Sequence, residues 1–262
     1  MIRSLFKKTV LTSQVHCHWL GALKSHLYRR TRKWLRMPHE PEFASIPCFQ
    51  PQRDSLFLDI GANLGQSIDS IRLYASESPI ISFEPNPYLA DRLRGLQTRD
   101  QQISIEECGL GSVDGQVKFY IPVYNGYAFH ELASVSPLHQ RDWLKPRIWG
   151  FDDARLTMIE SVWRIRRLDD LRISPLFIKV DVEGAELDVI RGGLNTIERC
   201  QPAILLEGVS FDGELKNLLR PMGYQMYRFQ RGVFSRADGR LDSAFLISEP
   251  RRNEMKRSIF RG

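Results

Sequence analysis

The sequence predicts a doubly wound α/β fold, in which a mostly parallel β-sheet carries helices on both faces. From Arg53 onward, short apolar runs alternate with helical patterns, and this alternation is typical of βαβ units. The pattern changes near the end of the chain, where "GYQMYRFQRGVFSRADGRLDSAFLIS" indicates two strands around an Ala-Asp-Gly turn. A length of 262 residues suits one such domain with extensions. The sheet is therefore expected to close with an antiparallel hairpin.

The individual elements follow from the apolar runs and from the helical spacing between them. Strands are expected at Leu56–Ile60, Ile80–Phe83, Ile103–Glu106, Leu176–Val180 and Ala203–Leu206. Helices are expected at Gln66–Tyr74, Pro87–Leu96, Ala185–Gly192 and Asp212–Leu219. Two further strands, near Val117 and before Arg167, flank an irregular loop from Tyr124 to Gly150. Loops of this length inside a compact domain are more often functional than idle.

The two ends of the chain differ from its body in charge. Residues 1–40 carry nine lysines and arginines against one acid, residues 251–262 carry five against one, and residues 41–250 carry 23 against 29. We expect a basic helical extension with a proline-rich linker at 1–52, the main domain at 53–250 and a basic tail at 251–262. Because the body is acidic, a nucleic-acid-binding face is disfavoured. The partner of residues 1–40 is an anionic membrane, another polyanion or none, and a helix that packs on the domain is the alternative.

Cysteine usage and hydropathy favour a cytoplasmic protein, peripheral to a membrane if residues 1–40 bind one. The four cysteines are far apart and include no Cys-x-x-Cys pair, so neither a disulfide framework nor a zinc ribbon is indicated. No apolar run approaches the roughly 20 residues that span a bilayer. Gln14, His16 and His18 interrupt the apolar stretch that a secretory signal requires. The "HCH" run at 16–18 is a poor metal site, because residues two apart on a helix do not face each other.

The first strand-to-helix turn, in "SLFLDIGANLGQSIDSI", has the features of a cofactor site. Asp59 ends the strand, and Gly61, Asn63 and Gly65 follow in the turn. Ligands of open α/β sheets bind at this edge, where Gly61 permits a positive φ and the helix N-terminus offers N–H donors. No Gly-Lys-Ser/Thr follows, which excludes a P-loop. Asn63 and Gln66 replace two glycines of the dinucleotide fingerprint, which disfavours NAD.

Glu84 ends the next strand, in "IISFEPNP", 25 residues after Asp59. A carboxylate at this position accepts hydrogen bonds from a ribose diol, in NAD and in S-adenosylmethionine alike. A turn with an aspartate and spaced glycines suits the sulfonium and the amino-acid tail of S-adenosylmethionine, with Asp59 offering negative charge near its ammonium group. In the structural alternative, Asp59 caps a helix and Glu84 is a solvated strand end.

Six motifs together resemble the FkbM family of S-adenosylmethionine-dependent methyltransferases. They are "FLDIGANLGQS", "ISFEPNP", "ECGLGSVDGQVKFYIP", "LDDL", "FIKVDVEGAELDVIRGG" and "AILLEG". The resemblance covers roughly residues 54–248. It implies the Rossmann-like class I methyltransferase fold, with seven strands in the order 3-2-1-4-5-7-6, and O-methylation of a hydroxyl group on a small molecule, a lipid or a glycan.

The resemblance also assigns a role to individual positions. Asp59, Gly61, Asn63 and Gly65 are expected at the methionine end of the cofactor, and Glu84 at the ribose. Glu107 and Cys108 are expected beside the adenine. The neighbours Ala62 and Pro85 complete the expected cofactor-binding residues. The chain departs from the family at one place, because Glu107-Cys108-Gly109 stands where an Asn-x-Ala-like stretch is frequent.

Candidate bases follow the fourth strand and lie in the long loop. In "KVDVEGAE", Lys179, Asp181 and Glu183 alternate with valines and share one side of the strand. Lys179 is expected to neutralise the acids, and Asp181 or Glu183 to remove the proton of the acceptor hydroxyl. A cap and ion-pair network is the structural alternative. His130 and His139 in the loop are further candidate bases, with surface histidines as the alternative.

Three questions stay open at this stage. Glu207 ends the fifth strand beside Asp181, but two or three oxygen ligands are few for a divalent cation, so no metal is expected. The leading interpretation is an S-adenosylmethionine-dependent O-methyltransferase. An NAD-dependent oxidoreductase and a non-catalytic nucleotide-binding protein docked by its basic ends are the alternatives. No motif identifies the methyl acceptor or the oligomeric state.

Overall fold

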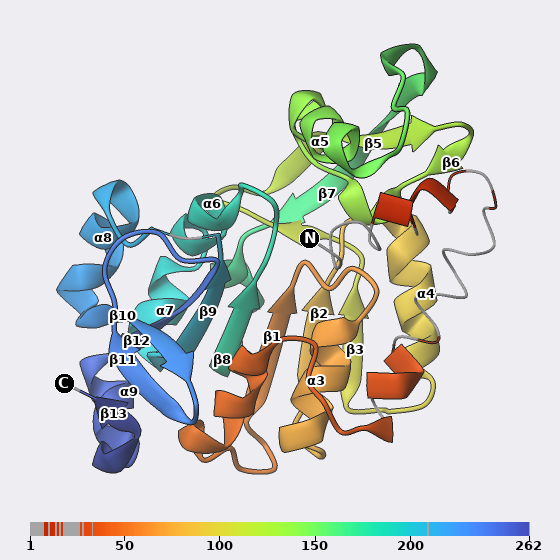
Figure 1. Ribbon diagram of the computed structural model, residues 1–262. Coiled ribbons are helices and arrows are strands. Elements are labelled where there is room, and N and C mark those ends of the chain that lie inside the picture. Colours follow the sequence, from red (N-terminus) through yellow and green to blue (C-terminus); the bar gives the residue numbers. More distant parts are fainter. Residues whose placement is uncertain are drawn as a thin grey trace. The chain divides into compact units, whose positions relative to one another are not determined.

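The computed structural model describes residues 8, 9, 11–13, 15, 17, 27, 29–32, 34–208 and 210–261 (Figure 1). These residues form two compact units. The smaller unit contains the described residues up to Leu35 together with 116–163, and the larger contains 36–115 and 164–261. The grouping differs from the expected division at residues 52 and 250, because 36–52 and 251–261 belong to the larger unit. Most of the expected N-terminal helix lies outside the described residues.

The larger unit is built on a nine-stranded sheet with the order β13-β11-β10-β12-β9-β8-β1-β2-β3 (Figure 1). Its strands are β1 (Leu56–Ile60), β2 (Ile80–Phe83), β3 (Ile103–Glu106), β8 (Pro175–Val180), β9 (Ala203–Glu207), β10 (Tyr224–Gln230), β11 (Val233–Arg236), β12 (Ser243–Ser248) and β13 (Phe260–Arg261). The pairs among β3, β2, β1, β8 and β9 are parallel, and β12 is antiparallel to β9 and β10. The predicted class I order is confirmed, and β11 and β13 extend the sheet beyond seven strands.

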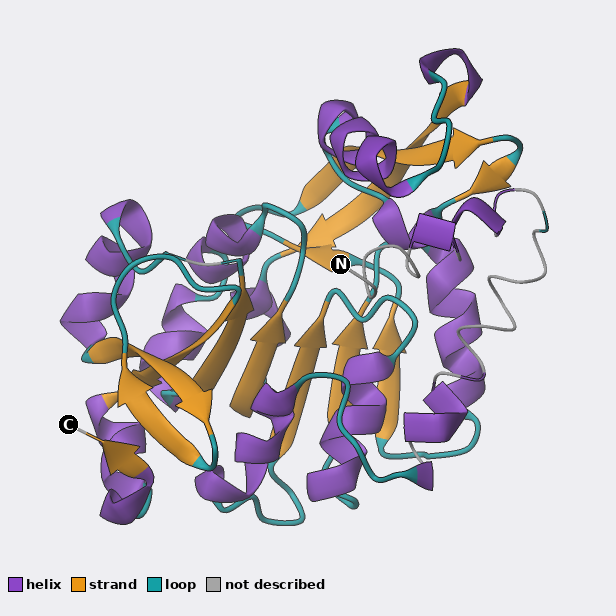
Figure 2. Ribbon diagram, viewed as in Figure 1, coloured by secondary structure: helices purple, strands orange, loops and turns teal. Residues whose placement is uncertain are grey.

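Helices connect the strands of the larger unit (Figure 2). The α-helices with described bounds from residue 36 onward are α3 (Gln66–Tyr74), α4 (Pro87–Gln97), α5 (Pro137–Leu144), α6 (Glu186–Arg191), α7 (Leu194–Cys200), α8 (Gly213–Leu219) and α9 (Glu249–Glu254). The 3₁₀ helices are η1 (Pro41–Phe49), η2 (His130–Leu132), η3 (Lys145–Arg147), η4 (Asp153–Arg155), η5 (Leu168–Leu171), η6 (Arg220–Met222) and η7 (Arg257–Ile259). The five strands and four helices that were predicted with bounds are all present within one residue of those bounds.

Alternation along the strands sends side chains to two separate cores, one on each face of the sheet. Leu58 and Ile60 of β1 join a cluster with residues of α6, α7 and α8. Phe57 of β1 and Phe177 of β8 join another cluster, with residues of η1, α3, α4 and α9. Each face is thus covered by helices of its own, as a doubly wound sheet requires.

The expected proline-rich linker is instead a folded segment, which we call the strap (residues 36–50). Its helix η1 buries Phe43 and Ile46 completely, and the ring of Phe49 packs against three phenylalanines of the sheet. These three apolar residues are spaced by three, which is the period of a 3₁₀ helix, so they share one face. Prolines suggested an extended linker, but a proline at the start of η1 needs no amide donor and its fixed φ suits a helix.

The C-terminal hairpin differs from the prediction in the position of its turn. Strands β10 and β11 meet at Arg231 and Gly232, which both have positive φ, 51° and 81°. Two successive positive φ values are the geometry of a type I′ turn, whose twist matches that of paired strands. The predicted turn, Ala237 to Gly239, lies in the connection from β11 to β12 instead. The segment that was expected to form two strands forms three, β10, β11 and β12. Strand β12 pairs with both β9 and β10.

The expected basic tail is also part of the larger unit. Helix α9 begins with Ser248 as its cap, and Arg251 donates hydrogen bonds to the carbonyl oxygens of Cys200 and Gln201. Met255 is buried, and β13 pairs in parallel with β11. The charge of this segment therefore lies on folded structure.

The smaller unit has a sheet and a core of its own. Strand β5 (Gly115–Tyr124) lies between β7 (Leu156–Arg166) and β6 (Tyr127–Ala128). The predicted irregular loop contains α5, and four of its apolar side chains form a cluster with Val15: Tyr124, Phe129, Leu144 and Ile148. The last residues of β7 belong to the larger unit, where they pair with β4 (Gly109–Leu110). In the described part of the chain, no helix is long and apolar enough to cross a membrane.

Candidate active site

The turn after β1 has the backbone conformation that its sequence predicts. Gly61, Asn63 and Gly65 have positive φ values of 80°, 50° and 82°. A methyl group on Gly61 would collide with the backbone carbonyl of Asp181, at the end of the neighbouring strand β8. Only glycine combines this φ with such close contact, so Gly61 sets the distance between the turn and β8.

Glu84 holds this turn from the end of β2. Its Oε2 accepts a hydrogen bond from the amide of Asn63 at 2.8 Å, and its Oε1 accepts one from the amide of Asn86 at 2.9 Å. The residue is buried, and burial raises the pKa of the Glu84 carboxyl to about 7 despite both amide donors. Sequence reasoning placed Glu84 at the ribose and missed this second role. Each carboxyl oxygen has a further lone pair, so the bonds to the turn leave room for a ligand hydroxyl.

Lys179 lies between two carboxylates, as predicted. Its Nζ is 3.6 Å from Asp59 Oδ1 and 3.3 Å from Asp181 Oδ2, and it donates a 2.9 Å hydrogen bond to the carbonyl of Gly61. Burial alone would lower the pKa of Lys179, but the surrounding carboxylates raise it above its usual value. Burial raises the pKa of Asp59, which is 0% exposed, and Lys179 opposes that shift. The ammonium group therefore stays charged inside the sheet.

The polar side chains at the strand ends lie on one face. Asp59 is two residues after Phe57 in β1, and Lys179 is two residues after Phe177 in β8. Residues two apart on a strand share a face, so both point to the face that the strap and α3 cover. The same alternation places three further carboxylates there. We call this set the polar row: Glu84, Asp59, Lys179, Asp181 and Glu207.

Glu207, at the β9 end of the polar row, meets a residue that sequence reasoning missed. Glu40 of the strap is one of the groups that act on the carboxyl group of Glu207. Burial, the charge of Asp181 and the charge of Glu40 raise the pKa of Glu207 to about 9. The sequence did not identify Glu40 as a site residue, because the strap was expected to be a proline-rich linker. The spacing of Phe43, Ile46 and Phe49 by three residues could have predicted a helix in this segment.

The other candidate bases are Glu183, His130 and His139. Glu183 is exposed and has a φ of 53°, at a point where the strand has already ended. Glu186 accepts a hydrogen bond from the amide of Gly184 at 3.1 Å and thereby holds that turn. His130 and His139 belong to the smaller unit, and the side chain of His139 lies outside the described residues. Their roles stay predictions.

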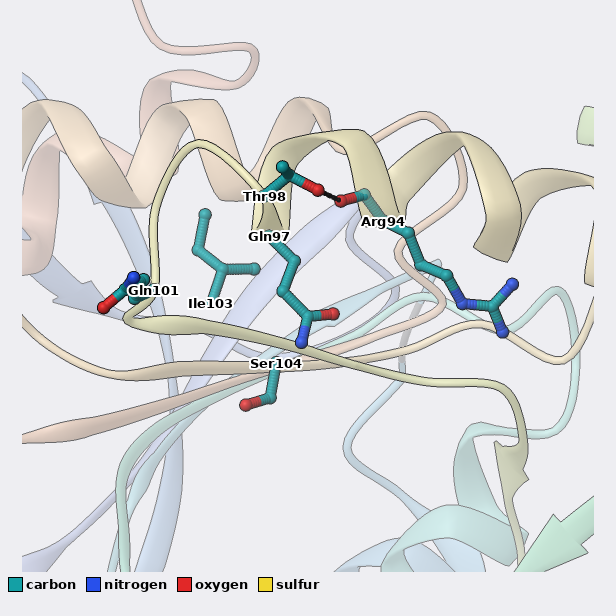
Figure 3. Close-up of a pocket in the computed structure, with 6 residues that line it drawn as sticks. All are labelled: Arg94, Gln97, Thr98, Gln101, Ile103 and Ser104. Carbon is teal, nitrogen blue, oxygen red and sulfur yellow. Dashed lines mark hydrogen bonds between the residues drawn. The ribbon is translucent and has the colours of Figure 1, made fainter.

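The expected adenine contacts differ from each other in exposure. Glu107 is exposed and forms an ion pair with Arg94 of α4. Cys108 is buried in the aliphatic core, and burial raises the pKa of its thiol. Arg94 also lines a surface pocket beside the start of β3, where Thr98 donates a hydrogen bond to the Arg94 carbonyl (Figure 3).

The metal expectation concerned Asp181 and Glu207. Within the described ranges, no group of three or more histidines, cysteines and acidic residues could hold a metal ion. Lys179 occupies the space beside Asp181 that a cation would need, because its ammonium already pairs with that carboxylate.

The family model and the two relatives that match this chain are all described as methyltransferases. A family model described as "Methyltransferase FkbM domain" matches residues 59–226. The 2-O-methyltransferase NoeI of Sinorhizobium fredii (strain NBRC 101917 / NGR234) is 28% identical over 152 residues, which are 56% of this chain and 60% of that protein. Methyltransferase 1 of Beauveria bassiana (strain ARSEF 2860) is 25% identical over 151 residues, 53% of this chain and 58% of that protein. The chain thus spans about 60% of the length of these relatives.

A solved structure of the same description is also similar. The crystal structure of a methyltransferase FkbM from Methylobacillus flagellatus KT superposes with a TM-score of 0.48 and 18% identity. The superposition covers 74% of this chain and 44% of that one.

Proposed function

The chain belongs to the FkbM methyltransferase family, whose model matches well over half of it, and from this premise we propose that it is an S-adenosylmethionine-dependent O-methyltransferase. The proposed acceptor is a hydroxyl group on a small molecule, a lipid or a glycan. The 2-O-methyltransferase name of one relative supports oxygen as the acceptor atom. The observation that carries the proposal is the turn at 61–65, which Glu84 holds against the ends of β1 and β8.

The residues of the larger unit fit the proposed cofactor. Gly61 and Gly65 adopt a positive φ and carry no side chain at their two positions of the turn, and Glu84 offers carboxyl oxygens to a ribose. Asp59 and Asp181 both lie within 4 Å of the ammonium group of Lys179, so two acids face one base, and negative charge here suits a sulfonium and an ammonium group. When bound, S-adenosylmethionine supplies an electrophilic methyl group. Ala62, Pro85, Glu107 and Cys108 complete the proposed cofactor-binding residues.

Asp181 is the proposed base. It lies at the end of β8 and, at 30% side-chain exposure, is the more accessible of the two partners of Lys179. A carboxylate at this place can accept the proton of an acceptor hydroxyl. General bases of this kind contribute about 10²- to 10⁴-fold to turnover. Glu183 and His139 are the alternative bases.

We further propose an anionic membrane as a partner of residues 1–40. The side chain of Trp34 is 81% exposed beside Arg32 and Leu35, and an exposed aromatic among arginines suits a lipid interface. Sedimentation with vesicles of neutral and of anionic lipid tests this. Binding should require the anionic lipid and fall in Trp34→Ala, and equal binding to both vesicles would contradict it.

Ligand binding and turnover test the main proposal separately. S-adenosylhomocysteine should raise the melting temperature. At 100 times its Kd, it should stabilise the folded protein by about 2.7 kcal/mol. Methyl transfer from labelled S-adenosylmethionine to a panel of hydroxylated acceptors should occur in the wild type. Asp181→Asn should retain cofactor binding and lose turnover, whereas the exposed control Asp170→Asn should retain both. Stabilisation by NADH alone would overturn the proposal in favour of an oxidoreductase.

A further inference from the structure

Glu186, the first residue of α6, turns its carboxylate back to the loop that follows β8. Its Oε1 accepts a hydrogen bond from the amide of Val182 at 3.4 Å and another from the amide of Gly184 at 3.1 Å. Ala185, at the N-cap of α6, forms no side-chain cap. The carboxylate of Glu186 therefore binds the loop that precedes its own helix.

This loop has a backbone conformation that needs outside support. Glu183 and Gly184 both have positive φ, 53° and 103°. Glycine adopts such values readily, whereas a residue with a Cβ atom does so at a cost in free energy. Strained residues persist where surrounding contacts fix them. The amides that bind Glu186 belong to the two neighbours of Glu183, so these bonds fix the backbone on both sides of the strained residue.

Asp181 lies between two peptide units that are both held. The amide of Asp181, on its N-terminal side, donates a 3.1 Å hydrogen bond to the carbonyl of Ile60 in β1. On its C-terminal side, the carbonyl of Asp181 lies against Gly61, where a Cβ atom would collide with the oxygen. The amide of Val182, in the same peptide unit, binds Glu186. Because a peptide unit is planar, contacts with its carbonyl and with its amide together fix its orientation.

The side chain of Asp181 extends from this held backbone. Its Oδ2 lies 3.3 Å from Nζ of Lys179, and the side chain stays 30% exposed. The backbone sets where the side chain begins, and Lys179 sets where one of its oxygens lies. Displacing a reacting group by about 1 Å can lower turnover about 10²-fold. A residue that holds the backbone of Asp181 therefore bears on methyl transfer without touching the reacting atoms.

We propose that Glu186 is a positioning residue, which holds the loop after β8 so that the carboxylate of Asp181 points at the hydroxyl group of the acceptor. The acceptor oxygen forms a bond with the methyl carbon as the bond from that carbon to sulfur breaks, and the proton of the hydroxyl passes to Asp181. Glu186 exchanges no proton in this step. The inference rests on the proposed function and on Asp181 as the base.

Hydrogen exchange of backbone amides tests the hold without turnover. In Glu186→Ala, the amides of Val182 and Gly184 lose their acceptor and should exchange about tenfold faster. Glu186→Gln keeps an acceptor oxygen and should stay close to the wild type. Glu198→Ala is the matched control, because Glu198 is an exposed glutamate of the next helix, α7. It should follow the wild type in exchange and in turnover.

Steady-state kinetics test the positioning. In Glu186→Ala, kcat should fall about tenfold or more, because Asp181 is displaced from the acceptor. The affinity for S-adenosylhomocysteine and the acceptor KM should stay within about twofold of the wild type, since Glu84 holds the turn at 61–65 independently. Glu186→Gln should restore most of kcat. In the Asp181→Asn background, the same alanine substitution should cause no further loss, because the group that Glu186 positions no longer acts as a base.

The possible failures are distinguishable. Unchanged amide exchange in Glu186→Ala would show that the loop is not held by Glu186. Faster exchange with an unchanged kcat would show that the loop is held but that turnover does not depend on it. Equal falls of kcat in the wild-type and Asp181→Asn backgrounds would show that Glu186 does not act through Asp181. A wild type that neither binds S-adenosylmethionine nor transfers methyl groups overturns the proposed function itself, whatever the exchange rates are.

Discussion

The two ends of the polar row differ in what contacts them. Backbone amides bind the carboxyl group at the β2 end, and a second acidic side chain lies near the carboxyl group at the β9 end. At the β2 end, Glu84 binds the amides of Asn63 and Asn86, which are close to it in the chain or in the adjacent turn. At the β9 end, Glu207 meets Glu40, which comes from a distant part of the sequence. Lys179 joins the two ends through Asp59 and Asp181.

This difference between the two ends of the polar row suits two tasks, cofactor binding and acceptor recognition. Two backbone amides fix the carboxyl group of Glu84, which suits a cofactor that is the same in every turnover. Burial and neighbouring acids raise the pKa of Glu207, so its charge depends on its surroundings, which suits the recognition of an acceptor. Four variants break or sharpen this comparison.

Phe49→Ala should have the largest effect on stability, because it releases the strap from the β9 end. The ring is 5% exposed and packs against Phe177, Phe234 and Phe245. Its removal should lower the free energy of unfolding by about 3–5 kcal/mol, measured by urea denaturation. Phe49→Leu keeps most of the apolar contact and should lose less than about 1.5 kcal/mol. Equal losses in the two variants would show that the ring packing does not anchor the strap.

Gly61→Ala should act almost as strongly, but through the β2 end. The added methyl group meets the carbonyl of Asp181 at a φ of 80°, so β1 and β8 must move apart. A loss of about 2–4 kcal/mol is expected in denaturant unfolding, together with loss of S-adenosylhomocysteine binding. Gly95→Ala is the control, because Gly95 lies within α4 with open space around it. Alanine there should stabilise the helix by about 0.5–1 kcal/mol.

Glu84→Gln should weaken the turn without removing it. The amide keeps one acceptor and places its NH₂ group opposite a backbone N–H, at an expected loss of about 1–3 kcal/mol. Because the folded pKa of Glu84 is about 7 and its ordinary value is 4.5, wild-type stability should fall as the pH rises through 7. The variant should lack this fall. A variant that keeps it would contradict the role of Glu84.

Arg94→Ala should have the smallest effect. The guanidinium and its partner Glu107 are both exposed, and exposed ion pairs contribute little to stability. The melting temperature should not change measurably. If Glu107 contacts the adenine, as proposed, the variant should alter cofactor affinity slightly, by less than Glu84→Gln does. A titration of S-adenosylhomocysteine by calorimetry measures both.

The β2 end could be predicted well from the sequence, because its determinants are local. The run that contains Asp59 and Gly61 gives the strand, the turn and the positive φ within a few residues, and each agrees with the structure. The ion pairs of Lys179 also follow from alternation along one strand. The contact of Gly61 with β8 did not follow, because it depends on how closely two strands approach.

The β9 end could not be predicted in the same way. Glu40 comes before β1 and Glu207 ends β9, so all the parallel strands of the sheet lie between them in the chain, and no local pattern connects the two residues. Proline content also misled the prediction, since η1 begins with Pro41 and contains Pro47. The turn at Arg231 and Gly232 was missed for another reason, because Ala-Asp-Gly nearby offered a second glycine turn of similar form.

Buried Lys179 has a consequence for how the strands choose their partners. Shifting β8 by one residue against β1 would turn Lys179 to the opposite face, among the aliphatic side chains beneath α6 and α7. Neither Asp59 nor the end of β9 could then neutralise it, and an unpaired buried charge costs about 3–5 kcal/mol. The charges that we assign to catalysis therefore also specify the register of the sheet, and a misaligned intermediate is penalised before any ligand binds.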